Sequence, residues 1–363
     1  MKNITKINYI SELNLPNKSA YSIHVMKMCE AFSALGYDIN LFVINNKKNS
    51  QKVFNSYNIK KRFKIISIFN SFKQFNFLLR IIFAFKILSK NFEYDSIFLS
   101  RSIIFALFGS IFNKKIILEL HHEITGFSKL IYWTFNFLGL TQNLKFIFLN
   151  KELKKIYKIK DKKSVVLDDA INLEDFKKKK SKKFKKTSVY IGSFFEGKGI
   201  EQIIRLAKYN KNLYFHIYGE KRYLKYDKKL KNIKIFDYVN YSKIPTILSR
   251  YEVALMPYQN KIKGRGSIWL EKYMSPLKMF DYMAAKMIII ASDLKVYSHI
   301  LKNNTNCKLV KVNDDRKWSK IISLIFKNLN DYRYLKKNAY LTVKKYTWKN
   351  RCVKIINLAK KNI

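Results

Sequence analysis

The segment Ser275-Pro-Leu-Lys-Met-Phe-Asp-Tyr-Met-Ala-Ala285, with the apolar run Met287–Ala291 behind it, decides the fold of this 363-residue chain. Ser275 is a residue type preferred at helix N-caps and Pro276 suits the first helical position, so a helix is predicted to begin here. The apolar run is typical of a buried strand. A helix that leads into a buried strand is the repeating unit of a parallel sheet covered by helices.

The same alternation continues along the chain. The β-branched run Ile39–Ile44 follows a segment with helical spacing of apolar residues, Ser22–Leu35, and Gly36 stands where that helix should end. Other short apolar runs predicted to be buried strands are Ser96–Ser100, Lys115–Leu120, Phe146–Leu149, Ser188–Gly192, Leu213–Tyr218 and Glu252–Met256. Amphipathic segments such as Gly199–Tyr209 and Ser242–Ser249 lie between them. We therefore predict an α/β protein with parallel sheets covered by helices on both faces.

Length and composition indicate two domains. The chain is 48% hydrophobic, with 28 Phe and 24 Tyr, which provides enough apolar surface for two cores. A boundary is predicted near Val165–Asn172, just before the basic stretch Lys177–Lys186. That stretch is interpreted as a solvated loop, with a phosphate or membrane contact as the alternative.

The net charge is +47, from 72 Lys and Arg against 25 Asp and Glu. Such a charge attracts polyanions, including nucleic acid, anionic lipid headgroups and phosphorylated small molecules. A genome rich in A and T would produce the same mixture of Lys, Ile, Asn, Phe and Tyr without any selection for charge. The aromatic residues lie mostly within apolar periodic segments, so we expect no nucleic-acid partner. A non-enzymatic nucleic-acid-binding protein is kept as an alternative.

Cysteine content and hydropathy predict a cytoplasmic chain that is neither secreted nor integral to a membrane. The three cysteines lie far apart and predict neither a disulfide framework nor a zinc site: Cys29, Cys307 and Cys352. The start of the chain lacks the apolar core of a signal peptide. Of the most apolar stretches, Phe75–Leu88 is interrupted by charges and Ile131–Leu140 is too short to cross a bilayer.

A first candidate site follows the predicted strand that ends at Gly192. The segment Ser193–Ile200 (SFFEGKGI) is a strand-to-helix turn that directs free backbone N–H groups to the edge of the sheet. Lys198 supplies a mobile cation there, and Gly199 allows a phosphate to approach closely. The glycine spacing is not that of a P-loop. A simple turn without a ligand is the alternative.

A second candidate site is the helix that begins near Ser275. Its N–H groups and dipole favour a bound anion. Asp281, one to two turns into the helix, is suited to accept hydrogen bonds from two vicinal ribose hydroxyls. The alternative is an ordinary capped helix in which Asp281 pairs with Lys278.

Two further segments place polar or small residues beside a ligand site. Glu119-Leu-His121-His122-Glu123 ends a predicted strand, where His121 is suited to act as a general acid or base or to bind a sugar hydroxyl. Adjacent histidines of an extended chain point to opposite sides and no third ligand cluster is apparent, so no metal site is expected. Leu15–Ser22 carries Ser19 and Ala20 at a strand-to-helix turn, where an N-cap loop is the alternative to a ligand contact.

With these segments in this order, the whole chain resembles a family 4 glycosyltransferase of the GT-B fold. The resemblance is carried by SELNLPNKSAYSIHVMKMCEAFSALGYDINLF, ILELHHE, FIFLNKELKK, VLDDAINLEDF, VYIGSFFEGKGIEQIIRLA, IPTILSRYEVALMPY, SPLKMFDYMAAKMIIIASD and YTWKNR. It implies two Rossmann-like domains whose parallel sheets face a cleft. Residues 1–167 would be the acceptor-binding domain and residues 168–345 the nucleotide-sugar-binding domain, with residues 346–363 a helix that crosses back to the first.

The resemblance also implies roles for individual residues. Lys198 and Gly199 would contact the donor diphosphate, backbone N–H groups near Leu277 and Lys278 would hold its distal phosphate, and Asp281 would bind the ribose. The donor-binding set is completed by Ser193, Gly219, Ser275 and Pro276. His121 would lie beside the transferred sugar as the catalytic residue. Ser19 and Ala20 would contact the acceptor.

The implied reaction is a retaining, metal-independent sugar transfer without a cofactor, from a UDP- or GDP-type nucleotide diphosphate sugar. The implied acceptor is a cell-surface polysaccharide or a lipid-linked glycan. The basic charge and the stretch Phe72–Lys90 fit peripheral contact with the inner face of an anionic membrane, although that stretch also reads as a buried helix. Another GT-B enzyme, such as a nucleotide-sugar epimerase, is an alternative.

Three features depart from the family pattern. Ser19-Ala20 stands where the first loop usually has two glycines, and no Arg precedes Lys198 in the donor loop. Tyr273 and Asp281 stand at the two positions where the family usually has glutamates.

Overall fold

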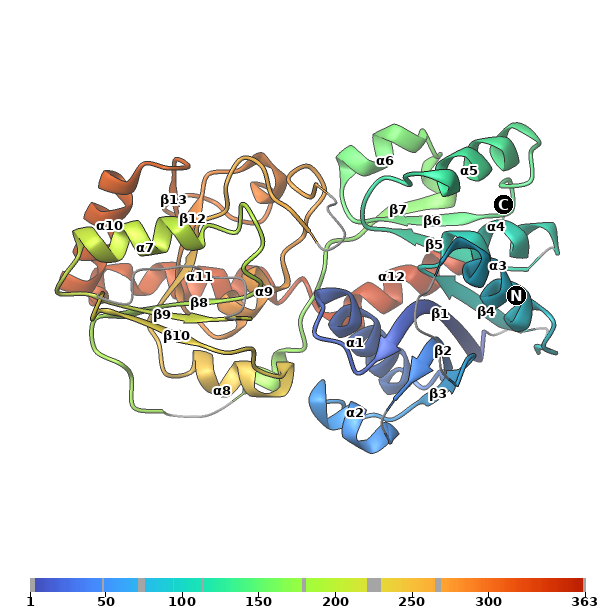
Figure 1. Ribbon diagram of the computed structural model, residues 1–363, viewed down its shortest axis with the longest axis horizontal. Helices are drawn as coiled ribbons and strands as arrows, with labels where there is room; N and C mark the ends of the chain where they lie inside the picture. Colours follow the sequence, from blue (N-terminus) through green and yellow to red (C-terminus); the bar gives the residue numbers. More distant parts are fainter. Residues whose placement is uncertain are drawn as a thin grey trace. The chain divides into compact units, whose positions relative to one another are not determined.

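The computed structural model describes residues 4–47, 49–70, 76–93, 95–112, 114–177, 181–220, 230–264 and 269–361. The chain divides into two compact units. Unit 1 comprises Met1–Asp168 and Trp348–Ile363, and unit 2 comprises Asp169–Thr347. Both units are drawn in Figure 1. The stretches Phe72–Lys90 and Lys177–Lys186 lie only partly within the described residues.

Unit 1 is built on a seven-stranded sheet in the order β3-β2-β1-β4-β5-β6-β7, and every pair of neighbouring strands is parallel. The strands are β1 (Lys6–Leu15), β2 (Asp38–Asn46), β3 (Lys64–Ser67), β4 (Ser96–Ser100), β5 (Ile116–Leu120), β6 (Lys145–Phe148) and β7 (Ser164–Val166). The central strands β4 and β5 are buried along their whole length, as continuous apolar runs predict for a sheet covered on both faces.

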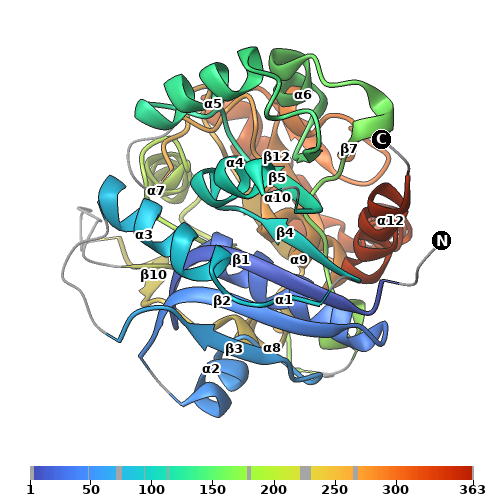
Figure 2. The same cartoon turned by 90° about the vertical axis from the view of Figure 1, so that its right-hand side faces the viewer.

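Helices cover both faces of this sheet. They are α1 (Ala20–Ala34), α2 (Ser50–Ser56), α3 (Phe77–Leu88), α4 (Ile103–Ile111), α5 (Phe127–Phe137), α6 (Lys151–Tyr157) and the C-terminal α12 (Trp348–Lys360). Helices α3, α4 and α5 are neighbours on one face, and α1 packs beside α12 on the other (Figure 2). The last segment of the chain therefore completes the unit that the first segment begins.

Unit 2 contains a six-stranded parallel sheet in the order β10-β9-β8-β11-β12-β13. Its strands are β8 (Thr187–Ile191), β9 (Tyr214–Tyr218), β10 (Ile233–Phe236), β11 (Val253–Met256), β12 (Ile288–Ser292) and β13 (Lys308–Val310). Its helices are α7 (Ile200–Tyr209), α8 (Ile244–Leu248), α9 (Leu277–Ala284), α10 (Asp315–Lys327) and α11 (Arg333–Val343). Apolar residues of α7 and α10 pack on one face of the strands to form the main core.

The predicted fold class is confirmed: both units are parallel α/β sheets of Rossmann type. The prediction missed four strands: β3, β7, β10 and β13. These have only three or four residues each, and β3, β10 and β13 each carry a lysine. Short strands at or near a sheet edge need no long apolar run, so periodicity does not reveal them.

The start of the deciding helix differs from the prediction. Helix α9 begins at Leu277, with Pro276 rather than Ser275 at the N-cap and no side-chain cap. The hydroxyl oxygen of Ser275 instead accepts a hydrogen bond from the backbone N–H of Asp169, at 3.0 Å. Ser275 thus fastens the first residue of unit 2 to the segment before α9, and the helix N–H groups are left without a capping side chain.

Candidate functional site

Two lysines converge near the carboxyl end of β8 in unit 2. Lys198, in the turn before α7, is only 8% exposed, and its Nζ lies 5.1 Å from the ring centre of Tyr258. Lys278, in the first turn of α9, places its Nζ 5.2 Å from the same ring and 3.5 Å from that of Tyr190. Lys198 is therefore a buried cation, not the mobile one expected from sequence.

The ammonium group of Lys278 is buried and has no hydrogen-bond partner among the described residues. A buried cation without a partner is costly, and proteins normally pair or neutralise such groups. Burial, followed by repulsion from Lys198, holds the pKa of Lys278 well below its usual value, although Asp281 opposes this. Burial lowers the pKa of Lys198 to about 8. The pair thus presents two amino groups, and nothing in the described surroundings fully balances the charge that they carry when both are protonated.

Glycines bring these groups close to the backbone. A Cβ on Gly192, directly after β8, would lie 2.6 Å from Lys278 Nζ, and a Cβ on Gly219, directly after β9, would lie 2.4 Å from the carbonyl oxygen of Gly192. Gly199 has a φ of +83°, and a Cβ there would lie 1.9 Å from the carbonyl oxygen of Pro257. At Gly199 and Gly219 a side chain would meet backbone atoms, so local packing requires glycine there. The close approach of a phosphate to Gly199 remains a prediction.

Asp281 lies one turn beyond Lys278 on α9 and is 6% exposed. Its Oδ1 accepts a hydrogen bond from the hydroxyl of Tyr241, at 3.1 Å. No hydrogen bond joins Asp281 to Lys278, although the charge of Asp281 acts on Lys278. The alternative of an ordinary Asp281–Lys278 pair is therefore not realised.

The remaining predicted donor residues lie around this cluster. Ser193 is exposed after β8, and its carbonyl oxygen accepts a hydrogen bond from Tyr190 at 2.8 Å. The hydroxyl of Tyr282 accepts from the backbone N–H of Ile191, at 2.9 Å, and so fixes α9 against β8. The sequence did not single out Tyr190, Tyr241 or Tyr258. Tyr190 and Tyr258 lie in or beside apolar strand segments, where a tyrosine is expected in the core, and Tyr241 lies in a polar stretch without a motif.

Unit 1 contains a different charged cluster around Glu119 on β5. The Oε1 atom of Glu119 lies 2.6 Å from His121 Nε2 and 2.9 Å from His24 Nε2. The same oxygen accepts a hydrogen bond from Arg351 Nη2 at 2.9 Å. Burial by itself would raise the pKa of Glu119, but His24 and then Arg351 hold it well below the ordinary value. His24 comes from α1 and Arg351 from α12, so elements from both ends of the chain meet here.

His121 is neutral at physiological pH, because burial and then the charge of Arg101 lower its pKa to about 3 against the opposing effect of Glu119. Since ionised Glu119 can only accept hydrogen bonds, the proton of His121 resides on Nε2 and Nδ1 can accept one. A neutral imidazole of this kind binds a hydroxyl and does not donate a proton as a strong acid.

A third potential metal ligand, not apparent from the sequence, joins this segment: ligand atoms of His24, Glu119 and His121 lie within 4.8 Å of one another. The sequence did not predict His24 because it appears within an otherwise ordinary helix. The guanidinium of Arg351 bonds to the same Glu119 oxygen as both histidines. That positive charge disfavours a divalent cation on the same oxygen.

Ser19 and Ala20 stand at the start of α1. Ser19 is the N-cap, and its side chain accepts a hydrogen bond from the backbone N–H of Ser22 at 3.2 Å. Ala20 is the first helical residue. The N-cap interpretation therefore describes the local geometry, and a contact with a ligand remains a prediction.

Part of the chain matches a known protein family. Residues 172–342 match the family model of Glycosyl transferases group 1. No curated protein matches the chain by sequence.

Similar solved structures share the fold across their full length. A glycosyltransferase from Rickettsia africae is 15% identical, with 99% of this chain and 98% of that chain covered and a TM-score of 0.71. A second similar structure is a mutant of TarM from S. aureus in complex with Fondaparinux, alpha-GlcNAc-glycerol and UDP. It is 14% identical, with 98% of this chain and 100% of that chain covered and a TM-score of 0.72. HepE from Anabaena, in complex with UDP and glucose, is 10% identical, with 97% of this chain and 99% of that chain covered and a TM-score of 0.70.

Proposed function

We propose that this chain is a glycosyltransferase of the GT-B type, and that it transfers a sugar from a UDP-sugar to a lipid-linked glycan with retention of configuration and without a metal ion. Its use of a nucleotide sugar follows from the group 1 match over residues 172–342 together with the two-unit fold.

The observation that carries the donor proposal is the unpartnered ammonium of Lys278 beside Lys198. A diphosphate brings the negative charge that this pair lacks. The uncapped N-terminus of α9 adds N–H donors beside Lys278, and a helix N-terminus favours a phosphate. Asp281, held by Tyr241, would accept hydrogen bonds from the ribose hydroxyls.

The same charges support metal independence. When the sugar leaves, negative charge builds on the diphosphate, and a fixed cation stabilises it. In many transferases a divalent metal supplies that charge. Two lysines and a helix N-terminus would supply it here, with each charge-assisted hydrogen bond worth about 1.5–3 kcal/mol. UDP in the TarM and HepE structures supports a uridine donor ahead of a guanosine one.

His121 is proposed to accept a hydrogen bond from a hydroxyl of the transferred sugar through Nδ1. Its neutral state argues against a general acid and in favour of positioning. Glu119 and His24 would fix the ring for that contact. Ser19 and Ala20 are proposed to border the acceptor, where their side chains narrow the approach relative to glycine.

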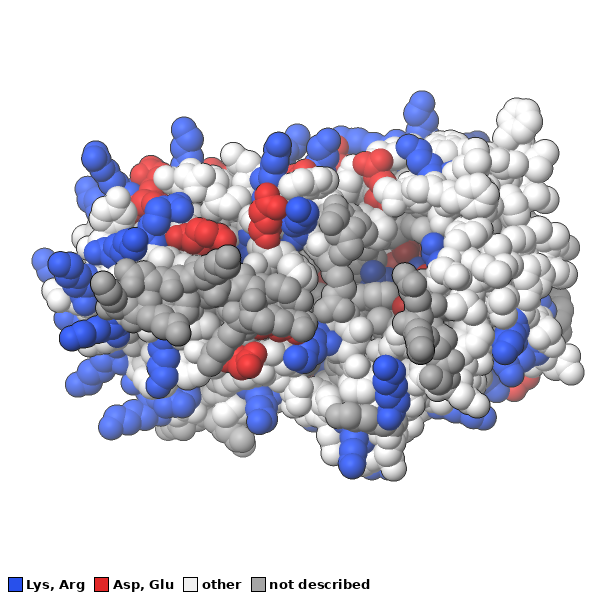
Figure 3. Space-filling model, viewed as in Figure 1, with Lys and Arg blue, Asp and Glu red and all other residues white. Residues whose placement is uncertain are grey.

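The membrane-bound acceptor is supported by helix α5, which carries its apolar side outward. Phe127 is 59% exposed, Leu130 61% and Phe137 89%, whereas Ser128 and Tyr132 of the same helix are buried. Soluble helices normally have the opposite arrangement. Figure 3 shows a largely uncharged area over this part of unit 1.

Neighbouring helices extend this area. Phe77 of α3 contacts Phe127 of α5 at 4.9 Å between ring centres, and Phe108 of α4 contacts Phe135 of α5 at 5.9 Å. We define the α3–α5 surface as the exposed large apolar residues of these helices and their ends: Leu78, Phe85, Ile111, Phe112, Phe127, Leu130, Trp133, Phe137 and Leu138. A patch of this kind marks an interaction site.

Exposed lysines on the same helices make an anionic bilayer the partner that fits best. Lys86 of α3 and Lys129 of α5 are both exposed. Aromatic side chains beside cations are typical of interfacial membrane binding. No helix among the described residues combines the length and apolarity needed to cross a bilayer. Peripheral contact is therefore the proposed mode.

The donor proposal is tested by thermal shift with UDP-, GDP- and ADP-sugars. UDP-glucose or UDP-GlcNAc should stabilise the protein most, because a ligand that binds only the folded state raises its melting temperature. The shift should persist in EDTA. The anomeric configuration of the transferred sugar, read by NMR, tests retention. No shift with any activated sugar would reject the proposal, and epimer formation without an acceptor would favour an epimerase.

The membrane proposal is tested by flotation with vesicles of phosphatidylcholine alone or with about 30% phosphatidylglycerol, a charge density that attracts basic protein surfaces. Binding should need the anionic lipid and weaken as salt rises. A Leu130→Ser/Phe137→Ser variant should lose most of it. The matched control is Leu324→Ser/Tyr334→Ser, which alters two exposed apolar residues of unit 2 and should float like the parent protein. Equal flotation of both variants would exclude the α3–α5 surface.

A further inference from the structure

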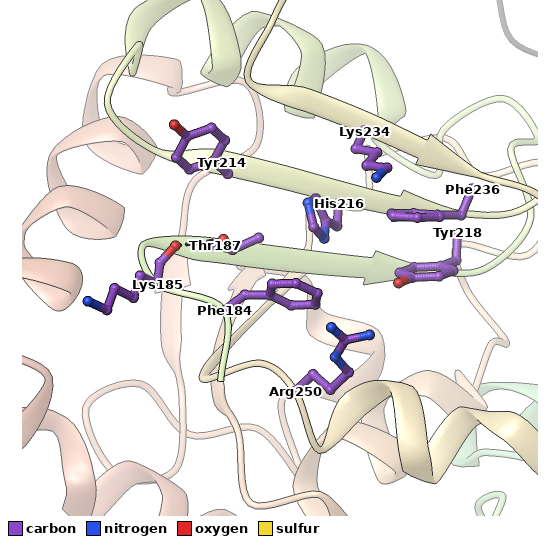
Figure 4. A pocket seen from close by; sticks show the side chains of 9 residues that line it. All are labelled: Phe184, Lys185, Thr187, Tyr214, His216, Tyr218, Lys234, Phe236 and Arg250. Atoms are coloured by element: carbon purple, nitrogen blue, oxygen red, sulfur yellow. Dashed lines mark hydrogen bonds between the residues drawn. The ribbon is translucent and has the colours of Figure 1, made fainter. Parts of the chain in front are cut away.

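A pocket of about 500 Å³ lies on the sheet of unit 2, over β8, β9 and β10. Phe215 and Ile217 of β9 point into the core beneath α7 and α10. Because strand side chains alternate, Tyr214, His216 and Tyr218 face the opposite side. The pocket is lined by these three residues together with Phe184, Lys185, Thr187, Lys234, Phe236 and Arg250 (Figure 4).

Aromatic rings form most of its lining. The rings of Tyr218 and Phe236 stack with 4.4 Å between their centres and 9° between their planes. His216 contacts Phe184 at 5.0 Å and Phe236 at 5.2 Å, both edge to face. The hydroxyl of Tyr251 bonds to His216 Nδ1 at 2.7 Å and to the Tyr218 hydroxyl at 2.9 Å. The lining is therefore fixed before any ligand binds.

Cations surround these rings. The guanidinium carbon of Arg250 lies 4.1 Å from the ring centre of Phe184, and Lys234 Nζ lies 5.3 Å from that of Phe236. Lys185 is the third cation, and no carboxylate lines the pocket. In the part of the chain that the structure describes, none of the three forms an ion pair, so their N–H donors are available to an anion.

The middle of the pocket provides neutral hydrogen-bonding groups. Burial, and then the charges of Lys234 and Arg250, lower the pKa of His216 to about 4, so its imidazole is neutral. Nδ1 is engaged by Tyr251, which leaves Nε2 for a ligand. Thr187 and Tyr214 add hydroxyl groups along the same lining. Rings, neutral polar groups and cations together match a molecule with an apolar face, hydroxyls and a negative group.

We propose that this pocket binds an acidic sugar residue of the glycan that the enzyme extends, at a position separate from the donor site. Sugar C–H faces pack on aromatic rings, while Arg250 recognises a carboxylate or phosphate through its fork of N–H donors. The inference rests on the proposed function for the identity of the glycan, but the geometry of the pocket does not depend on it.

The arrangement favours a sugar over nucleic acid. Single-stranded nucleic acid is bound by successive aromatic platforms along a basic groove. Here the rings converge on one pocket, and Tyr218 and Phe236 already stack on each other. A pocket of this size suits a small ligand and not a continuous strand.

The pocket also has a definite relation to the donor residues. Tyr218, at one end, directly precedes Gly219, and Gly219 packs against Gly192 beside Lys278. The pocket thus extends along β9 toward the carboxyl edge of the same sheet. A glycan held there would be retained near the donor between successive transfers, and its loss would raise the KM for acidic acceptors more than it lowers kcat.

The test is titration calorimetry of the full-length protein with two acidic probes, trigalacturonate for carboxylate and trehalose 6-phosphate for phosphate. At least one should bind, and neutral maltotriose should bind at least about tenfold more weakly because it lacks a partner for the cations. Arg250→Ala and Lys234→Ala should each weaken that binding by about tenfold to a hundredfold. The matched control is Lys208→Ala, an exposed lysine on α7 at the opposite face, which should bind like the parent protein.

Three results would overturn the proposal: no binding of either acidic probe, binding that the Arg250 and Lys234 variants leave unchanged, or tighter binding of a dT oligonucleotide that those variants abolish. A parallel titration with UDP separates this inference from the proposed function. The pocket variants should retain the parent affinity for UDP. If UDP fails to bind while an acidic probe binds, the donor proposal fails and the pocket stands.

Discussion

Each unit buries a cluster of charged side chains near the carboxyl edge of its sheet, and the two clusters differ in how their charge is balanced. In unit 1, ionised Glu119 is met by Arg351 and two histidines, so the charges compensate within the protein. In unit 2, Lys198 and Lys278 carry the same sign, and Lys278 has no hydrogen-bond partner among the described residues.

The difference separates a cluster that balances its own charge from one that a charged ligand would balance. A compensated buried cluster stabilises the arrangement that holds it, and removing one member leaves an uncompensated charge. An uncompensated cluster stores a cost that a ligand of opposite charge removes. Perturbed lysines beside glycines and an uncapped helix therefore support the proposed donor site more strongly than the histidine-rich segment does.

The largest effect should come from breaking the compensated cluster. Arg351→Ala leaves Glu119 ionised and buried, and should lower the free energy of unfolding by about 3–5 kcal/mol. Denaturant unfolding followed by circular dichroism measures this. Lys349→Ala, an exposed change on the same helix, should cost less than about 0.5 kcal/mol. An equally small loss for Arg351→Ala would show that the cluster does not stabilise unit 1.

A substitution in the uncompensated cluster should have a smaller effect, and that effect should fall on ligand affinity instead of stability. Lys278→Met removes a buried cation while keeping an unbranched side chain, so the free energy of unfolding should stay level or rise. Affinity for UDP should fall about tenfold to a hundredfold, as expected for one charge-assisted hydrogen bond. Calorimetric titration measures the affinity, with Lys243→Met as an exposed control. Lost stability with intact UDP binding would reverse the roles assigned to the two clusters.

The smallest effect should be a pH dependence of UDP affinity. Lys198 has a pKa of about 8 without ligand, and a bound diphosphate should raise it. Below pH 8 the ammonium of Lys198 is already charged, so its contribution to the affinity should be level. Above pH 8 binding must take up a proton, so affinity should fall by up to about tenfold per pH unit. Titrations from about pH 7 to pH 9 measure this, and Lys198→Met should flatten the profile. A parent profile without the decline would remove Lys198 from the phosphate contact.

Much of the fold could be predicted because the strands of a covered parallel sheet are continuous apolar runs. Central strands such as β5 and β12 are buried at every position, and their sequences show it. The four short strands β3, β7, β10 and β13 were missed because they depend on pairing with a neighbour already in place. Ser275 reads as an N-cap by residue type, but its hydroxyl is engaged by Asp169, 106 residues away in the chain.

The residues of the candidate site likewise fall into those that the sequence singled out and those that it did not. Local sequence was enough to single out Lys198, Gly199 and Asp281, because glycine spacing and a helix start are local signals. It could not predict that Lys278 would lie buried against Tyr190, nor that His24 and Arg351 would meet at Glu119. Those facts depend on residues 88 to 232 positions apart in sequence, which only the folded sheets bring together.

The amino-acid sequence by itself therefore determined most of the interior strands and the fold class, since backbone propensity and apolar periodicity act over a few residues. Tertiary structure alone decided which charges are balanced and which are left for a ligand, because electrostatic compensation depends on distance in space. The same holds for α5 and for the pocket over β9: whether an aromatic side chain is core or surface depends on what packs against it.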